Sequence, residues 1–267
     1  MDHLVRGQIS SRAAEIYEDF FLPALFEQWA DVVADTAGLH AGERVLDVAC
    51  GTGVLARTVA RRVGATGWVG GLDVNEGMLA MAARKAPGID WRHGQAESLP
   101  FESASLDAVL CQFGLMFIED RERAVQEMRR VLRPGGRVAV AVWDRLDHTP
   151  GYAAMAALLQ RLFGDDAAKG LHTPFNMGDA AELQALFVTQ GFPNAQITTR
   201  QGAARFPSIE DWVRTEVYGW VLADVLSEAQ VAQLLTEAEQ VLARFADAEG
   251  RVSFAAPAHI LWAAKER

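Results

Sequence analysis

Two glycines and two aspartates form the first pattern in the chain whose residue types and spacing could do chemistry. Gly51 and Gly53 flank Thr52 directly after a short apolar segment that contains Asp47, and Asp73 follows Gly53 by 20 residues. Glycines in the first strand-to-helix turn let the backbone approach a ligand closely, and a carboxylate about 20 residues further on accepts hydrogen bonds from ribose hydroxyls. The spacing therefore predicts a site for a cofactor that contains a nucleoside.

This turn is compatible with more than one kind of cofactor. Residues 51–56 fit the glycine pattern of dinucleotide-binding proteins, in which the last position accepts alanine. Asp47 argues against a dinucleotide, because a carboxylate beside the turn repels a pyrophosphate but attracts an ammonium group. A cofactor with an ammonium group is favoured, and an NAD-dependent oxidoreductase is the alternative.

Strands and helices alternate on both sides of the turn. Apolar segments of strand length predict strands at residues 44–49, 68–74, 89–93, 106–113 and 137–143. Segments with helical spacing of apolar residues predict helices at residues 54–63, 76–85 and 121–132. This alternation is typical of βαβ units in a parallel sheet that is covered on both faces.

The remaining elements flank this core. We expect a helix over residues 11–37 that ends at Gly38 and is divided at Pro23, and a helix from Asp179 to Gln190 capped by the aspartate. Further predictions are strands at 195–200 and 252–264 and helical structure over 208–247. The sequence contains neither a low-complexity linker nor an internal repeat, which favours a single domain over residues 1–267.

Composition limits the classes of partner. The 267 residues carry a net charge of −10, which disfavours sequence-independent binding to nucleic acid. The acidity concentrates in residues 1–40, with seven acidic and two basic side chains, and in residues 205–250, with nine and three. No apolar run approaches the roughly 20 residues that span a bilayer, no signal peptide is recognised, and the two cysteines suit a reducing compartment. We expect a cytoplasmic protein without a membrane span, and a homo-oligomer is left open.

Four motifs in order resemble those of a known family. They are residues 45–53 (VLDVACGTG), 71–73 (GLD), 95–101 (QAESLPF) and 132–136 (LRPGG). Together they are similar to the motifs of class I S-adenosylmethionine-dependent methyltransferases, in the subgroup related to ubiquinone and menaquinone C-methyltransferases. The resemblance is strong over residues 12–143 and weaker beyond them.

The resemblance implies a fold and an organisation of the chain. The fold is α/β, a Rossmann-like doubly wound sheet of seven strands, mostly parallel with an antiparallel last strand, plus helical segments that form a lid. Residues 1–40 are expected to be N-terminal helices and residues 41–145 the cofactor-binding core. Residues 146–178 and 205–250 are expected to be inserts that cover the substrate.

The resemblance also implies where S-adenosylmethionine binds. Gly51 and Gly53 would pass under its methionine part, and Asp47 would hold its amino group. Asp73 would bind both ribose hydroxyls. The adenine would lie near Val74, Met78, Gln95 and Ala96, and the methyl group near Gln112 and Phe113. Two positions depart from the family pattern. Ala49, in the turn, stands where glycine is frequent, and Gln95 stands where aspartate is frequent. A glutamine oxygen can still accept a hydrogen bond from the adenine amino group.

An acceptor pocket is expected above the sheet, between the N-terminal helix and the two inserts. Its predicted lining is aromatic and apolar, which favours an apolar or aromatic acceptor and excludes water. The candidate residues are Tyr17, Phe20, Phe113, Met116, Trp143, Phe175, Trp212, Tyr218 and Trp220. We expect about half of them to be core packing instead.

The chemistry expected is methyl transfer to oxygen, nitrogen or carbon of a small-molecule acceptor by in-line displacement. The candidates for a general base are His148, His172 and Tyr218. A surface or packing role is favoured for each of them, so no catalytic base is predicted. No cluster of metal ligands is predicted. The alternatives are an RNA or protein methyltransferase and a cofactor-binding protein without transferase activity. The chain lacks the basic stripe typical of nucleic-acid-binding proteins.

Overall fold

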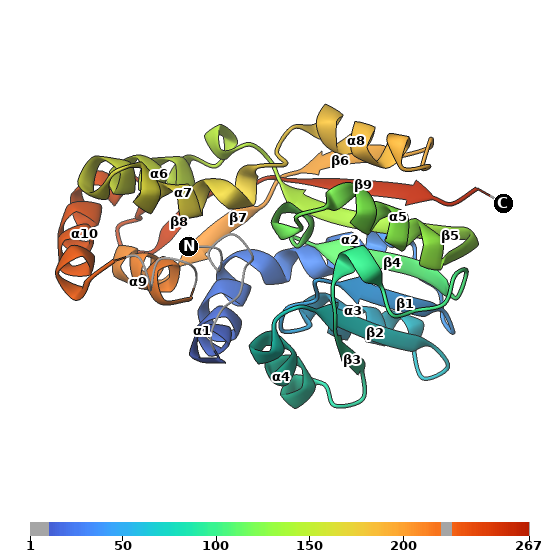
Figure 1. The fold of residues 1–267 in the computed structure, drawn as a ribbon. Helices are drawn as coiled ribbons and strands as arrows, with labels where there is room; N and C mark the ends of the chain where they lie inside the picture. Colours follow the sequence, from blue (N-terminus) through green and yellow to red (C-terminus); the bar gives the residue numbers. More distant parts are fainter. Residues whose placement is uncertain (1–10, 220–225, 267) are drawn as a thin grey trace.

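Seven strands form one twisted sheet in the computed structural model, which describes residues 11–219 and 226–266 (Figure 1). The order across the sheet is β3-β2-β1-β4-β5-β9-β6. Strands β1 to β5 pair in parallel, whereas β9 is antiparallel to both β5 and β6. The bounds are β1 Arg44–Val48, β2 Trp68–Asp73, β3 Asp90–His93, β4 Leu106–Gln112, β5 Leu132–Trp143, β6 Gln196–Arg200 and β9 Ala258–Ala264. The predicted fold class, a Rossmann-like doubly wound sheet with an antiparallel last strand, is confirmed.

The strand order reverses between β1 and β4, which lie side by side with Asp47 opposite Leu110. In open sheets of this type, ligands bind outside the carboxyl ends of the strands at such a reversal. The turn after β1 and the end of β4 therefore meet at the expected position of the site.

Helices lie on both faces of this sheet (Figure 1). Side chains cap the free N–H groups at the start of α4 and α5: the Asn75 side chain accepts from the Met78 N–H, and the Asp120 side chain accepts from the Arg123 N–H. Asp179 caps its helix as predicted. The bounds are α2 Glu27–Ala37, α3 Val54–Val63, α4 Glu76–Lys85, α5 Arg121–Val131 and α8 Ala180–Thr189.

The N-terminal helical run is continuous from α1 (Ser11–Ile16) through a π-helical segment, η1 (Tyr17–Phe26), into α2. It ends at Gly38, whose φ of 58° is left-handed, as predicted. The prediction that Pro23 divides the run is wrong. Pro23 lies inside η1, and the wider π-helical turns accommodate a residue that has no N–H to donate.

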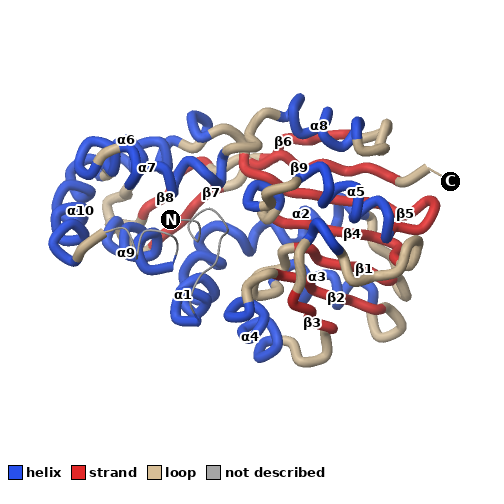
Figure 2. Tube along the Cα trace, viewed as in Figure 1, coloured by secondary structure: helices blue, strands red, loops and turns tan. Residues whose placement is uncertain are grey.

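A second, two-stranded sheet lies apart from the main one, among the helices of the later chain (Figure 2). It pairs β7 (Ala203–Phe206) with β8 (Val252–Ala255). The prediction of one last strand over 252–264 is corrected, because the chain leaves β8 at Pro257, which cannot donate to a strand ladder, and then enters β9. Strand β7 was not predicted, since its four residues are too few for a clear alternation.

Four helices surround this small sheet at one end of the molecule (Figure 2). They are α6 Pro150–Phe163, α7 Asp165–His172, α9 Ile209–Gly219 and α10 Glu228–Val241. Single 3-10 turns complete the chain: η2 Ala96–Ser98, η3 Leu115–Phe117, η4 Leu146–His148, η5 Thr173–Phe175 and η6 Ala243–Phe245. Over residues 11–219 and 226–266, no helix combines the length and the apolar character needed to cross a bilayer.

Candidate active site

The turn between β1 and α3 has an unusual backbone. Ala49, Gly51 and Gly53 have φ values of 54°, 54° and 84°, all in the left-handed region that favours glycine. The turn is tied to the next strand, because the Cys50 N–H donates to the Leu72 carbonyl at 3.0 Å. A Cβ built at Gly51 meets nothing within 4 Å, so open space lies above the backbone there.

Gly53 is required for a different reason. A Cβ at this residue would lie 2.3 Å from the ring of Trp91, a residue of β3. The indole Nε1 of Trp91 donates to the Ala86 carbonyl at 2.9 Å, which fixes the ring in place. No local pattern in the sequence indicates this contact, because β3 and the turn come together only through the sheet.

Asp73 holds the turn from the end of β2. Its Oδ2 accepts from the Gly51 N–H and its Oδ1 from the Asn75 N–H, each at 2.8 Å. Burial raises the pKa of this carboxyl, and the backbone hydrogen bonds partly offset that effect. Each carboxylate oxygen keeps a further lone pair, so the group can still accept from two hydroxyls.

Asp47 lies on β1 and is 1% exposed. Its Oδ2 accepts from the Ala56 N–H at 3.0 Å, whereas Oδ1 has no hydrogen-bond partner among the described residues. Burial and then the nearby Asp73 hold its pKa well above the usual range, against the opposing effect of the Ala56 hydrogen bond and Arg57. A buried carboxyl with a free oxygen beside a second carboxyl fits a cationic group such as an ammonium.

The end of β4 supplies the other wall. The Gln112 side-chain amide donates to the Phe26 carbonyl at 3.2 Å, while its Oε1 is buried without a partner in the described part of the chain. Phe113 follows with a φ of 55° and stacks on Trp143 at the end of β5, with ring centroids 3.8 Å apart. Two orphaned oxygens, on Asp47 and Gln112, thus lie at the ends of neighbouring strands.

The four residues expected near an adenine gather around the end of β2. The Gly94 N–H donates to the Asp73 carbonyl at 3.0 Å, which brings the loop with Gln95 and Ala96 to this point. Met78 lies in the first turn of α4 and is buried, as is Ala96, whereas Gln95 is exposed and Val74 is half-buried. The structure therefore brings together the predicted cofactor residues from three strand ends.

Tyr17 connects this region to an apolar cavity. Burial has the largest effect in raising the pKa of the Tyr17 hydroxyl, and the negative charges of Glu18, Asp73 and Asp47 raise it further. Its ring centroid lies 5.2 Å from that of Phe26 and 6.1 Å from that of Phe21. Both phenylalanines line a cavity of about 30 Å³, whose full lining is Phe21, Leu25, Phe26, Trp143, Tyr152, Leu171, Pro174, Phe175 and Glu216.

Sequence reasoning found two residues of this cavity, Trp143 and Phe175. It missed the other seven, since Phe21, Leu25 and Phe26 look like ordinary helix core and Glu216 looks like one more acid of an acidic helix. A signal was present in the acidic segment: Glu216 lies four residues from Trp212 on one helix face, and the indole donates to its Oε1 at 3.3 Å.

The other predicted pocket residues lie elsewhere. Phe20 is 48% exposed and Tyr218 is 40% exposed, because their faces of η1 and α9 turn away from the cavity. Met116 is buried in η3 and its carbonyl accepts from Asn176. Trp212 is fully buried and packs behind the cavity against Tyr152 and Phe254, while Trp220 lies outside the described residues.

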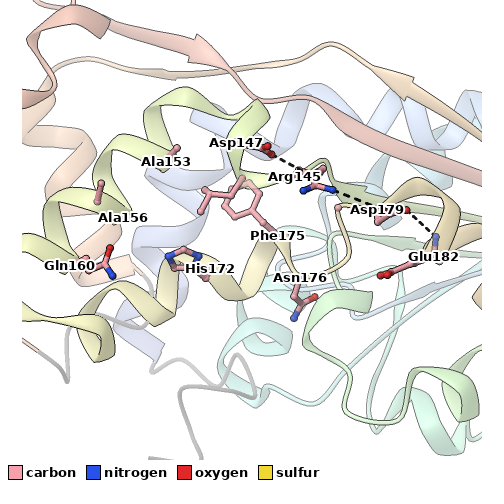
Figure 3. Close-up of a pocket in the computed structure, with 13 residues that line it drawn as sticks. Arg145, Asp147, Ala153, Ala156, Gln160, His172, Phe175, Asn176, Asp179 and Glu182 are labelled. Atoms are coloured by element: carbon pink, nitrogen blue, oxygen red, sulfur yellow. Dashed lines mark hydrogen bonds and ion pairs between the residues drawn. The ribbon is translucent and has the colours of Figure 1, made fainter.

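A larger, open pocket of about 580 Å³ lies on the other side of Phe175 (Figure 3). Arg145 and His172 border it, and Phe175 points between them. Arg145 forms ion pairs with Asp147 at 3.4 Å and with Asp179 at 4.0 Å. Phe175 is therefore the wall that the buried cavity and the open pocket share.

His148 has a structural partner, and both cysteines are buried. His148 bonds through Nδ1 to Asp144 at 2.9 Å, and the second oxygen of Asp144 pairs with His259 at 3.2 Å. Cys50 and Cys111 are buried free thiols, and burial raises the pKa of Cys111 to about 12. Neither thiol is therefore an activated nucleophile.

The strand order of the sheet, the glycine turn after β1 and the buried carboxyl groups of Asp47 and Asp73 together define the class of protein. It is a Rossmann-like methyltransferase with a site that fits S-adenosylmethionine. The model of the ubiE/COQ5 methyltransferase family matches residues 16–158, more than half of the chain. The chain belongs to this family, and it is an S-adenosylmethionine-dependent methyltransferase.

Relatives of known activity agree with this assignment. The chain is 32% identical to the 2-phytyl-1,4-beta-naphthoquinone methyltransferase of Arabidopsis thaliana over 76% of this chain and 80% of the relative. It is 34% identical to the demethylmenaquinone methyltransferase of Staphylococcus aureus strain JH9 over 66% of this chain and 80% of the relative.

Solved structures support the fold. The YcgJ protein of Bacillus subtilis is 21% identical, with a TM-score of 0.60 over 90% of this chain and 99% of its own. The phosphoethanolamine N-methyltransferase 2 of Haemonchus contortus is 18% identical, with a TM-score of 0.65 over all of this chain and 60% of its own.

Proposed function

We propose that this chain methylates an aromatic acceptor of the reduced naphthoquinone class. The observation that carries the proposal is the aromatic cavity next to the end of β4, where Phe26 and Trp143 line the cavity and both contact Phe113. Both relatives named above act on naphthoquinone-type molecules by their names. The cavity's lining of apolar and aromatic side chains with few polar groups suits such a ring, although the ring needs more space than the 30 Å³ that the cavity has with Phe175 in place.

Different residues of the cofactor site bind different parts of S-adenosylmethionine. In our assignment, Asp47 Oδ1 and the side-chain Oε1 of Gln112 accept from the ammonium group of the methionine part, since both are buried oxygens without a partner among the described residues. Asp73 accepts from the ribose hydroxyls while it holds Gly51 in place. Val74, Met78, Gln95 and Ala96 border the adenine.

Bound S-adenosylmethionine supplies an electrophilic methyl group on a cationic sulfur, whose departure as a neutral thioether needs no proton. The acceptor carbon or oxygen forms a bond to this methyl group as the bond to sulfur breaks, and the proton that the carbon or oxygen carried is released. The chain aligns the acceptor with the methyl group and excludes water, which together lower the barrier by several kcal/mol. The stacked rings of Phe113 and Trp143 form the wall between cofactor and acceptor. Aromatic faces at this position also favour a cation.

The organisation of the chain follows from these roles. We assign residues 41–145 to the cofactor-binding core, and residues 146–178 and 205–250 to segments that cover the acceptor, since Tyr152, Phe175 and Glu216 come from them. The cytoplasmic location and the oligomeric state stay predictions.

The test is a transfer assay with reduced 2-prenyl-1,4-naphthoquinone, a naphthoquinol that lacks the ring methyl. We expect formation of S-adenosylhomocysteine above the acceptor-free rate, and a product heavier by one methylene. Asp73→Ala is the matched control, because it removes a cofactor contact and leaves the acceptor cavity intact. Cofactor binding without transfer to this acceptor would contradict the proposed acceptor class.

A further inference from the structure

Glu216 is a carboxyl in apolar surroundings that the proposed function does not yet use. It is 3% exposed, and it is the one acidic side chain in the lining of the 30 Å³ cavity. Its neighbours in that lining are aromatic or aliphatic, apart from the Tyr152 hydroxyl, which hydrogen-bonds with the carboxyl. The indole of Trp212 donates to its Oε1 from behind the cavity at 3.3 Å.

The pair is held rigidly by packing. The Tyr152 ring on α6 meets Trp212 edge-on at 6.0 Å and Phe254 edge-on at 5.5 Å. Trp212 in turn packs on Phe254 at 4.7 Å. Groups placed by such packing bind a ligand with little loss of freedom, as positioned binding residues require.

The cavity also lies against the cofactor side of the site. Phe26 and Trp143 line it together with Glu216, and both contact Phe113, the residue after Gln112. A ring that packs against Phe26 and Trp143 therefore has Glu216 and Tyr152 as its polar neighbours. The end of β4 lies on the other side of the stacked rings of Phe113 and Trp143.

Phe175 controls the available space. A volume of about 30 Å³ accommodates one or two water molecules but no aromatic ring. The open pocket of about 580 Å³ shares Phe175 with the cavity. Displacement of this one side chain joins the two spaces, and a ring can then enter from the open pocket.

We propose that Glu216 and Tyr152 bind a ring hydroxyl of the acceptor, and that the ring lies between Phe26, Trp143 and the displaced Phe175. The acceptor class rests on the proposed function, but the hydroxyl contact does not require transfer to occur. Residue 216 lies outside the segment matched by the family model, which ends at residue 158.

The protonation of Glu216 supports this role. Burial raises its pKa to about 8, although the hydrogen bonds from Tyr152 and Trp212 oppose the shift. Tyr152 is the titratable group that faces it from α6, and the lining supplied by η1, β5, α7 and η5 carries no charge. At neutral pH the group is mainly a neutral acid, which both donates to and accepts from a hydroxyl.

The experiment compares 1-naphthol with naphthalene, which differ by one hydroxyl. Binding of each to the full chain saturated with S-adenosylhomocysteine is measured by calorimetry at pH 7. A purely apolar cavity prefers naphthalene, because the naphthol hydroxyl must leave water without a partner. We expect at least tenfold tighter binding of 1-naphthol to the unmodified chain.

Variants test whether Glu216 and Tyr152 cause the preference for 1-naphthol over naphthalene. Glu216→Leu and Tyr152→Phe should each reduce the preference at least fivefold, whereas Glu216→Gln should keep most of it because an amide also donates and accepts. Glu210→Gln, on the same helix but exposed and paired with Arg214, is the matched control and should change nothing. Unchanged S-adenosylhomocysteine affinity shows that each variant is folded. If Glu216→Leu does not fold, the preference for 1-naphthol over naphthalene in Tyr152→Phe tests the inference.

Any of the following results overturns the inference: no binding of either ring, equal binding of both to the unmodified chain, or a preference that survives in Tyr152→Phe and Glu216→Leu. Equal loss of both ligands in the variants also overturns it, because that pattern indicates a structural role. A Glu216-dependent preference without methyl transfer to the naphthoquinol would remove the proposed function alone.

Discussion

Phe113 and Trp143 stack face to face, with ring centroids 3.8 Å apart and ring planes at 10°. They end the neighbouring strands β4 and β5, where the Phe113 N–H donates to the Ala141 carbonyl at 2.9 Å. Phe113 adopts a φ of 55° to make this contact, and Trp29 packs edge-on against both rings. The pair therefore gives the cofactor side and the acceptor cavity one rigid common wall.

Replacing Trp143 by leucine should affect the acceptor more than the cofactor. The substitution removes the wall of the cavity but none of the hydrogen bonds around Asp47 and Asp73. We expect the KM for the naphthoquinol to rise about tenfold, which corresponds to about 1.4 kcal/mol, with a Kd for S-adenosylhomocysteine within about twofold. The converse pattern would place the cofactor, not the acceptor, against this indole.

Asp73→Ala should weaken cofactor binding by about 2 kcal/mol, since it removes a charge-assisted hydrogen-bonding partner. The substitution also frees the Gly51 N–H that this carboxylate fixes at 2.8 Å. Calorimetry with S-adenosylhomocysteine measures the effect. The comparison is Asp107, a buried aspartate that accepts from the Arg44 N–H at the amino ends of the central strands β4 and β1, away from the cofactor turn. An unchanged affinity in Asp73→Ala would place the ribose elsewhere.

Cofactor affinity should also fall as pH decreases. The pKa values of Asp47 and Asp73 are both raised by burial, so these groups take up protons at a higher pH than exposed aspartates do. A protonated carboxyl no longer attracts an ammonium group. Titrations from pH 8 to pH 5 should show a loss of affinity, and an affinity constant over that range would contradict the assigned ammonium contact.

Glu18 and Asp31 offer a matched test of how the N-terminal run is held on α3. Glu18 is buried and pairs with Arg57 at 3.2 Å, and Arg57 also donates to the Thr52 carbonyl in the cofactor turn. Glu18→Ala leaves a mostly buried guanidinium unpaired, and should cost about 2 kcal/mol of unfolding free energy or more. Asp31 pairs with Arg62 at the surface, and Asp31→Ala should change little. Urea unfolding compares the two, and equal losses would reject the assignment.

Glu216 should make stability decrease as pH rises. Its pKa is about 8 in the folded chain and near 4.5 when unfolded, so the folded state holds the proton more tightly. The resulting stabilisation is complete below about pH 4.5 and is lost as pH rises to about 8, by up to about 1.4 kcal/mol per pH unit. Glu216→Gln should have a flatter dependence than the unmodified chain in urea unfolding between pH 5.5 and 8.5. Parallel curves would show that the carboxyl is ionised throughout.

The sequence by itself determined the central part of the fold and the cofactor turn. The bounds of α3 and α4 were predicted to the residue, because local signals set them: a glycine turn before α3, and Asn75 and Pro87 around α4. Asp47, Gly51, Gly53 and Asp73 could be found because chain spacing alone places them at the ends of two adjacent parallel strands.

The tertiary structure decided the acceptor side. The lining of the cavity comes from three separate parts of the chain, namely η1, the segment from β5 to η5, and α9, which meet only through packing. Glu216 and the exposed Glu210 are both acids of one helix, and the spacing of Glu216 from Trp212 is the one local feature named above that distinguishes them. Burial against Tyr152 of α6 and the rest of the cavity lining favours the neutral form of Glu216, whereas Glu210 is exposed, because desolvation of Glu216 comes mainly from elements other than its own helix.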